Sequence, residues 1–145
     1  MQSVLAPSPH GPDMTSPDRQ IFDFDRVNYV VDFAHGSSTE ILFSRVLTRE
    51  SGQPYNFVDF VRVPPGSDIA FHRHASDNQE IYVIIAGTGR MRLEDREYPA
   101  GPGSLFVNPP GGAHGLTNTG PAELRLIVIE VPVAAGAHFR GRASP

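Results

Sequence analysis

The chain has 145 residues, including 14 glycines and 14 prolines, a composition typical of one domain built from short strands and tight turns. It has no cysteine and no lysine, which excludes thiol nucleophiles, disulfides, thiolate metal sites and lysine-based catalysis. Its formal net charge of -4 argues against nucleic acid as a partner, because phosphate binding needs a basic face.

The first 20 residues are rich in proline, serine and aspartate and have no periodic apolar pattern. We therefore expect residues 1–20 to form a flexible N-terminal arm, which includes His10. This segment lacks the basic start and the long apolar stretch of a signal peptide. The longest apolar runs, such as 126–129, are too short to span a bilayer. A cytoplasmic protein with no membrane partner is the expectation.

Eight segments predict β-strands, because each is short, β-branched or aromatic, and bounded by Gly, Pro, Asn or Asp. They are 28–33, 40–47, 56–63, 69–74, 80–86, 89–94, 104–109 and 123–131. Glycine and proline predict turns at 64–66, 87–89 and 99–103. No helical period extends over eleven residues between 20 and 135. The pattern predicts an all-β sandwich or barrel over 21–134, with a C-terminal tail at 135–145 that contains His138.

The segment FHRHASDNQEIYV places two histidines one residue apart, ahead of a glutamate. Side chains alternate along a strand, so His72 and His74 share one face. Glu80 opens the next strand and can face both across a hairpin, and His114 follows a later Pro-Gly turn. Three imidazoles and one carboxylate that converge in this way form a site for a divalent metal. A bare His-x-His pair is otherwise typical of an exposed strand, so the interpretation depends on the wider pattern.

That wider pattern resembles the two motifs of the cupin superfamily over residues 38–131. The first motif, Gly-x5-His-x-His-x3–4-Glu-x6-Gly, corresponds to Gly66, His72, His74, Glu80 and Gly87. The second, Gly-x5-Pro-x-Gly-x2-His-x3-Asn, corresponds with every spacing intact to Gly103, Pro109, Gly111, His114 and Asn118. The resemblance implies a cupin jelly roll with one divalent metal per subunit held by His72, His74, Glu80 and His114.

One spacing departs from the first motif, because five residues separate His74 from Glu80 where the family has three or four. The intact spacing from Glu80 to Gly87 favours Glu80 as the fourth ligand. Gln79 is the alternative, through its amide oxygen. If neither binds, three histidines and water complete the site.

Other candidates depend on which strand faces line the interior. Tyr82 shares the face of Glu80 by alternation, and Tyr82 and Phe106 are predicted to contact substrate. Tyr82 is equally interpretable as a buried core tyrosine. His35 precedes a strand and either touches the site or is a plain turn histidine. Three charged strand residues are either solvent-facing or functional: Arg45, Asp59 and Arg62.

Three neutral histidines and a carboxylate leave a net positive metal that suits Lewis-acid or redox chemistry. The chain loosely resembles the resistomycin-type aromatic polyketide cyclases. That resemblance implies an aldol ring closure and aromatisation of a polyketide or other carbonyl compound, with Glu80 or a metal-bound hydroxide as base and Tyr82 assisting. Zn2+ is the expected metal, with Fe2+ or Ni2+ as alternatives. The competing functions are an Fe2+-dependent dioxygenase and a non-enzymatic small-molecule-binding protein.

A homodimer is also expected, because exposed edge strands are commonly covered by a second copy. Residues 1–20 or the strand at 28–33 would cross between the subunits.

Overall fold

This computed structural model describes residues 17–50 and 52–141. Within them lie ten strands and two short 3-10 helices, joined by turns and loops. In chain order they are η1 (Pro17–Gln20), β1 (Val30–Asp32), η2 (Ala34–Gly36), β2 (Ile41–Thr48), β3 (Phe57–Val63), β4 (Asp68–Arg73), β5 (Asn78–Ala86), β6 (Gly89–Leu93), β7 (Arg96–Ala100), β8 (Leu105–Asn108), β9 (Ala113–Asn118) and β10 (Leu124–Pro132).

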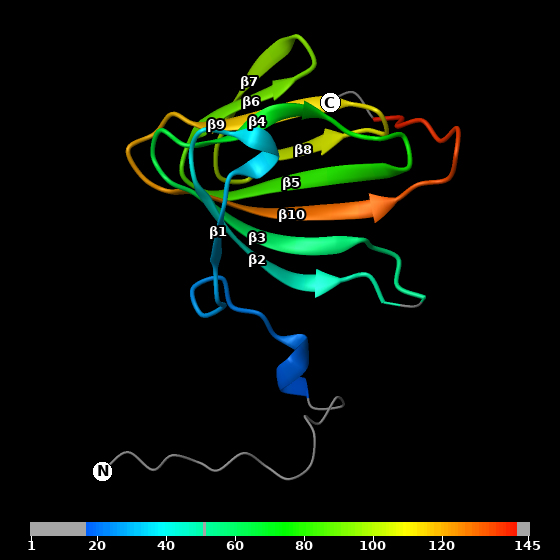
Figure 1. The fold of residues 1–145 in the computed structure, drawn as a ribbon, viewed down its shortest axis with the longest axis horizontal. Helices are drawn as coiled ribbons and strands as arrows, with labels where there is room; N and C mark the ends of the chain where they lie inside the picture. The colour runs from blue at the N-terminus through cyan, green and yellow to red at the C-terminus, as the bar shows by residue number, and fades with distance from the viewer. Residues whose placement is uncertain (1–16, 51, 142–145) are drawn as a thin grey trace.

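The strands form two antiparallel sheets, one above the other in Figure 1. The larger sheet has the order β1-β2-β3-β10-β5-β8 and the smaller has the order β4-β9-β6-β7. Strands that are distant in sequence are neighbours in both sheets, since β10 lies between β3 and β5, and β9 between β4 and β6. The predicted all-β jelly-roll sandwich is confirmed.

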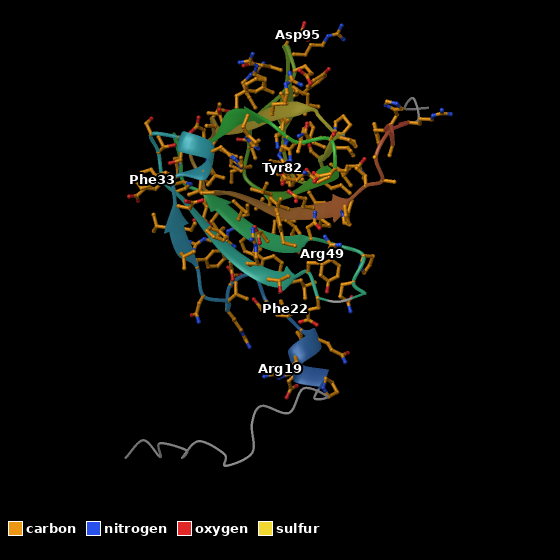
Figure 2. The ribbon with its side chains drawn as sticks, turned by 45° about the vertical axis from the view of Figure 1, so that its right-hand side comes forward. Arg19, Phe22, Phe33, Arg49, Tyr82 and Asp95 are labelled. Atoms are coloured by element: carbon orange, nitrogen blue, oxygen red, sulfur yellow. The ribbon has the colours of Figure 1, made fainter. Side chains whose placement is uncertain are left out.

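The core lies between the sheets and is built by alternation. Tyr82 and Ile84 of β5 point inward, and Leu124, Leu126 and Val128 of the neighbouring β10 do the same, each with an exposed fraction of 5% or less. Figure 2 shows Tyr82 in the interior, whereas Asp95 lies at the outer tip beside β6 and β7. The inner face of β5 therefore joins the core to the candidate site.

All eight predicted strands are present with small shifts at their ends, but β7 and β9 were not predicted. The turn expected at 99–103 begins later than predicted, because Pro99 and Ala100 still pair with β6. Proline is tolerated there because β7 is an edge strand. Strand β9 was not predicted because Gly115 weakens the strand pattern. A glycine is needed at this position, since a Cβ would lie 2.9 Å from Phe71 Cα.

A β-bulge in β4 turns the two motif histidines inward. Ile69 is opposite Leu116 of β9, but His72 is opposite His114, so β4 uses three steps where β9 uses two. Without the extra residue, Phe71 and Arg73 would follow Ile69 to the inner face. With it, Phe71 is 42% exposed and the histidines occupy the interior.

The chain ends are only partly described. Of the predicted arm, residues 17–20 form η1, whereas 1–16, which include His10, and 142–145 lie outside the described residues. His138 is exposed. Among the residues described, no helix has the length and apolar character needed to cross a membrane. β1 is an edge strand with Val30 and Val31 more than half exposed, and the homodimer through this region stays a prediction.

Candidate metal centre

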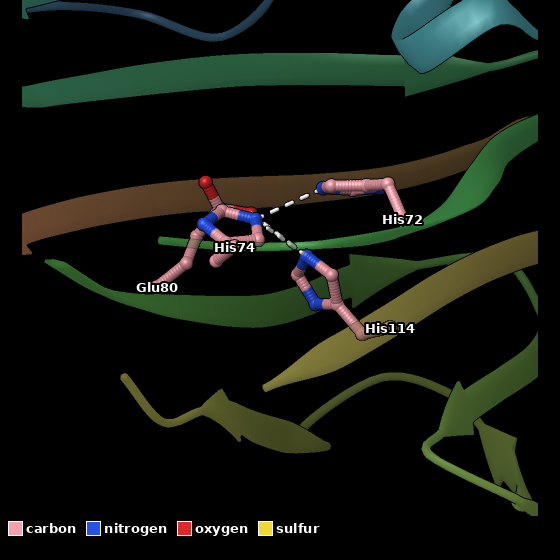
Figure 3. Close-up of side chains that lie close together, drawn as sticks. All are labelled: His72, His74, Glu80 and His114. Carbon is pink, nitrogen blue, oxygen red and sulfur yellow. Dashed lines mark hydrogen bonds and ion pairs between the residues drawn. The ribbon is translucent and has the colours of Figure 1, made fainter. Parts of the chain in front are cut away.

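Four side chains from three strands converge between the sheets (Figure 3). His72 and His74 come from β4 and its end, His114 from β9, and Glu80 from β5 of the opposite sheet. The Nε2 atom of His74 lies 2.9 Å from Nε2 of His72 and 3.1 Å from Nε2 of His114. The Oε1 atom of Glu80 lies 3.2 Å from Nε2 of His114 and 3.6 Å from Nε2 of His74.

Hydrogen bonds on the far side of two rings set which nitrogen carries the proton. The Nδ1 of His72 donates to the carbonyl oxygen of Ala70 at 2.7 Å, and the Nδ1 of His74 donates to Oδ1 of Asn78 at 2.8 Å. Both acceptors are oxygens without protons, so in the neutral form of each ring Nε2 carries a lone pair that points toward the other ring. Lone pairs at 2.9 Å repel one another unless a cation lies between them. The donor set therefore fits a divalent metal, because the hydrogen bonds to Ala70 and Asn78 orient His72 and His74 as such bonds orient metal-ligating histidines.

Burial keeps two of the three imidazoles, those of His72 and His114, neutral and ready to bind. Burial lowers the pKa of His72 to about 4, and burial followed by repulsion from His74 and His35 lowers the pKa of His114 to about 3. At neutral pH both rings are therefore uncharged. A metal meets little competition from protons at these two ligands.

Glu80 has two further polar neighbours. Its carboxylate hydrogen-bonds Tyr82, which is buried, and it faces Glu130, directly opposite it in the register of β5 and β10. Burial raises the pKa of both carboxyl groups. The Nδ2 of Asn56 donates to Glu130 Oε1 at 3.1 Å. Glu130 is thus a carboxyl group beside the cluster that is not one of the four converging side chains.

A cavity of about 270 Å3 opens beside the cluster. Seven apolar residues line it, Phe43, Phe57 and Val128 among them, together with eight polar ones. The polar lining residues are Asp32, His35, Arg45, Asp59, His74, Glu80, Tyr82 and Glu130. The ligand cluster therefore has access to a small chamber in which polar and apolar side chains converge, as they do in ligand sites.

Comparison with known proteins assigns the family. Residues 59–130, about half of the chain, match the family described as a cupin domain. The matched range contains all four converging side chains. The chain belongs to the cupin superfamily. The predicted membership is confirmed.

Relatives of this cupin span several described functions. An oxalate-binding protein of Thermotoga maritima is 25% identical over 95 residues, which are 65% of this chain and 78% of the relative. A solved structure described as a predicted oxalate decarboxylase, also from Thermotoga maritima, has a TM-score of 0.73 at 21% identity over 78% of this chain and 99% of that chain. A putative sugar phosphate isomerase from Acidithiobacillus ferrooxidans has a TM-score of 0.69 at 16% identity over 81% of this cupin and 78% of that chain. The structural similarities show the fold.

The cupin fold brings together the four predicted ligands, and metal binding by them stays a prediction. Gln79, the alternative to Glu80, precedes it directly in β5, so alternation turns the two side chains to opposite faces and favours Glu80 as the fourth ligand. Tyr82 lines the cavity. Phe106 of β8 pairs with Tyr82 in register and packs against the core, but it is not among the described residues that line the cavity. The substrate contacts predicted for Tyr82 and Phe106 stay predictions.

The charged strand residues divide between the two faces of the larger sheet. Arg45 and Asp59 line the cavity, with Arg45 Nε and Nη2 donating to the Asp59 carboxylate at 2.9 and 3.0 Å. Arg62 lies on the opposite face of β3 from Asp59 and Val61, and pairs there with Glu123 at 2.8 Å. Only the first pair can contact a molecule in the cavity.

Sequence reasoning missed Glu130 and left His35 undecided. Glu130 is in phase with Leu124, Leu126 and Val128 along β10, so a charged residue within an inward-facing apolar series was the signal. His35 carried no comparable signal, because it lies in a short turn far from the motifs in sequence. The structure places its ring on that of His72, with 3.4 Å between ring centroids.

Proposed function

We propose that this cupin is a metal-dependent enzyme that activates the carbonyl group of a small molecule for a non-redox reaction of the lyase or isomerase type. The observation that supports the proposal is the convergence of three imidazole nitrogens and one carboxylate oxygen at the wall of a small cavity. A divalent metal bound there, with Zn2+ as the metal expected from the sequence, supplies Lewis acidity to a substrate oxygen. His72 and His114, whose pKa values are lowered, stay neutral around it.

The residues around the ligands have distinct expected roles. Tyr82 holds the Glu80 carboxylate by a hydrogen bond, which keeps that side chain in the cluster. Arg45 presents a guanidinium whose Nε and Nη2 are held by Asp59, and it lies over the Phe57 ring at 4.1 Å, so its position in the cavity wall is well defined. An oxygen-rich substrate group can accept a hydrogen bond from it.

The volume of the cavity limits the size of the substrate. At about 270 Å3 it lies just below the range of about 300–1,000 Å3 that encloses drug-sized ligands. A full aromatic polyketide would extend out of this space. We therefore narrow the cyclase expectation to aldol-type chemistry on a small carbonyl compound.

Metal content and turnover test the proposal together. The protein is purified without a tag, its metals are measured by inductively coupled plasma mass spectrometry, and the loaded protein is incubated with small 3-oxo acids such as acetoacetate. We expect near-stoichiometric Zn2+ and a new product by NMR without oxygen consumption. His72→Ala and His114→Ala should lose both the metal and the turnover, whereas His138→Ala should keep both. Oxygen uptake by an iron-loaded protein would instead identify the dioxygenase.

Binding of a small dicarboxylate without turnover is a second candidate. The observation in its favour is the similarity to the relative described as an oxalate-binding protein. In this cupin the metal and Arg45 would share the two carboxylates. Calorimetric titration of the metal-loaded protein with oxalate separates the two candidates, because tight binding that leaves oxalate and the 3-oxo acids unchanged supports the binding protein.

A further inference from the structure

The imidazole ring of His35 lies flat against the ring of His72. Their centroids are 3.4 Å apart and their planes differ by 9°, whereas the ring of His35 is 6.4 Å from that of His74 and tilted by 48°. A nearly parallel stack at this distance leaves the His72 ring little freedom to turn about its own bonds. The contact is thus specific to one of the three imidazoles that converge on the centre.

The backbone of His35 adopts a conformation that residues other than glycine rarely take. Its φ is 57° and its ψ is 36°, which is the left-handed region, within the three-residue helix η2. Such a conformation persists where the surrounding structure holds it, and it is common at functional sites. Here it directs the ring toward the interior, where it lines the cavity.

Hydrogen bonds fasten the segment after His35 to the strand that carries His72. The hydroxyl groups of Ser37 and Thr39 both donate to Asp68 Oδ1 at the start of β4, the second over 2.9 Å. The backbone N–H of Asp68 donates in return to Thr39 Oγ1 at 2.9 Å. The segment that carries His35 and the strand that carries His72 are therefore held together both by these hydrogen bonds and by the ring stack.

We propose that His35 is a positioning residue, which holds the His72 ring by stacking so that Nε2 points at the metal. His35 is not itself a ligand, because it lies outside the group of described residues whose donor atoms converge. Its ring supports one face of His72 while the Ala70 carbonyl holds Nδ1. The inference rests on the metal site of the proposed function.

Variants that separate the ring from the backbone test this role. His35→Asn tolerates the left-handed backbone but removes the ring, and His35→Phe keeps a flat ring. We expect His35→Asn to weaken Zn2+ binding at least about 10-fold, as loss of a group that orients a metal ligand does, and to change the visible absorption of the Co2+-loaded protein. His35→Phe should restore Zn2+ binding to within about 3-fold of the wild-type protein. His138→Asn, which changes an exposed histidine, should match the wild-type protein.

Chelator competition gives the Zn2+ dissociation constants, and circular dichroism of the metal-free proteins confirms that each variant folds. If His35→Asn does not fold, His35→Gly removes the ring while relaxing the backbone. Wild-type affinity and an unchanged Co2+ spectrum in the ring-free variant would overturn the inference while the metal site stands. Equal weakening by Asn and Phe would overturn it too, because a flat ring against His72 would then make no difference to Zn2+ binding. A wild-type protein that binds no Zn2+ would overturn the proposed function as well.

Discussion

Protonation of His114 is costly because its ring is 1% exposed and surrounded by other imidazoles. Its pKa falls from 6.5 to about 3 on folding. Between pH 6.5 and pH 3 this residue is therefore protonated in the unfolded chain but neutral in the folded chain. The free energy of unfolding that this residue contributes is present above pH 6.5 and is lost as the pH falls toward 3. Metal-free protein should therefore become less stable on acidification through this window.

The matched variant His114→Gln isolates this contribution. Glu80 and Glu130 have raised pKa values, which act in the opposite direction, and both proteins contain them, so the difference between the two proteins reports on His114 and its contact with Glu80. We expect the melting temperature of the metal-free wild-type protein to fall relative to that of the variant as the pH drops from 7 to 4. Parallel melting curves across this range would mean that His114 titrates normally. Calorimetry in the presence of a chelator provides the measurement.

The bulge in β4 depends on a glycine in the strand beside it. A Cβ on Gly115 of β9 would lie 2.9 Å from Phe71 Cα and 3.0 Å from Phe71 N, both backbone atoms of the bulge that cannot move aside. Gly115→Ala should therefore destabilise the protein by about 1–3 kcal/mol, as overpacking does. It should also weaken Zn2+ binding, because the bulge sets the inward direction of His72 and supplies the Ala70 carbonyl.

Gly101→Ala is the control for that substitution, because a Cβ there meets nothing within 4 Å. We expect its stability and its Zn2+ affinity to match those of the wild-type protein. Urea unfolding and chelator competition give both quantities. A stable Gly115→Ala protein with full Zn2+ affinity would show that β4 can hold His72 without this bulge.

The same strands show where prediction from sequence succeeded and where it stopped. Alternation placed His72 with His74, and Glu80 with Tyr82, because each pair lies two residues apart along an extended stretch of chain. It did not reveal that Ile69 and His72 share a face, since that depends on a bulge formed against β9. Strand β9 was not predicted because Gly115 is unfavourable in a strand pattern. The glycine is needed there because a side chain would clash with the backbone of Phe71 in the neighbouring strand.

The position of His35 depends on contacts that sequence reasoning does not contain. Its stack on His72 requires the left-handed backbone of η2 and the hydrogen bonds from Ser37 and Thr39 to Asp68, 29 or more residues away. The family motifs therefore identified the residues that converge, but not the residue that supports one of them.

Across the whole molecule, the candidate centre links the two sheets. The three histidines come from β4, the residues just after it, and β9 of the smaller sheet, whereas Glu80 comes from β5 of the larger sheet. A metal held by all four would act as a cross-link at the core. Ligand binding to the folded state adds about 2.7 kcal/mol when the free metal is at 100 times its dissociation constant. Zn2+ should therefore stabilise the whole domain.

Hydrogen exchange distinguishes this cross-link from a metal held by one sheet. In the wild-type protein we expect Zn2+ to slow amide exchange in β4 and β9 and equally in β5 and its neighbour β10. In Glu80→Gln, which keeps the shape of the side chain but removes its charge, Zn2+ should protect mainly β4 and β9, because the remaining histidines belong to that side. Protection confined to the smaller sheet in the wild-type protein would contradict the cross-link and place Glu80 outside the metal's coordination.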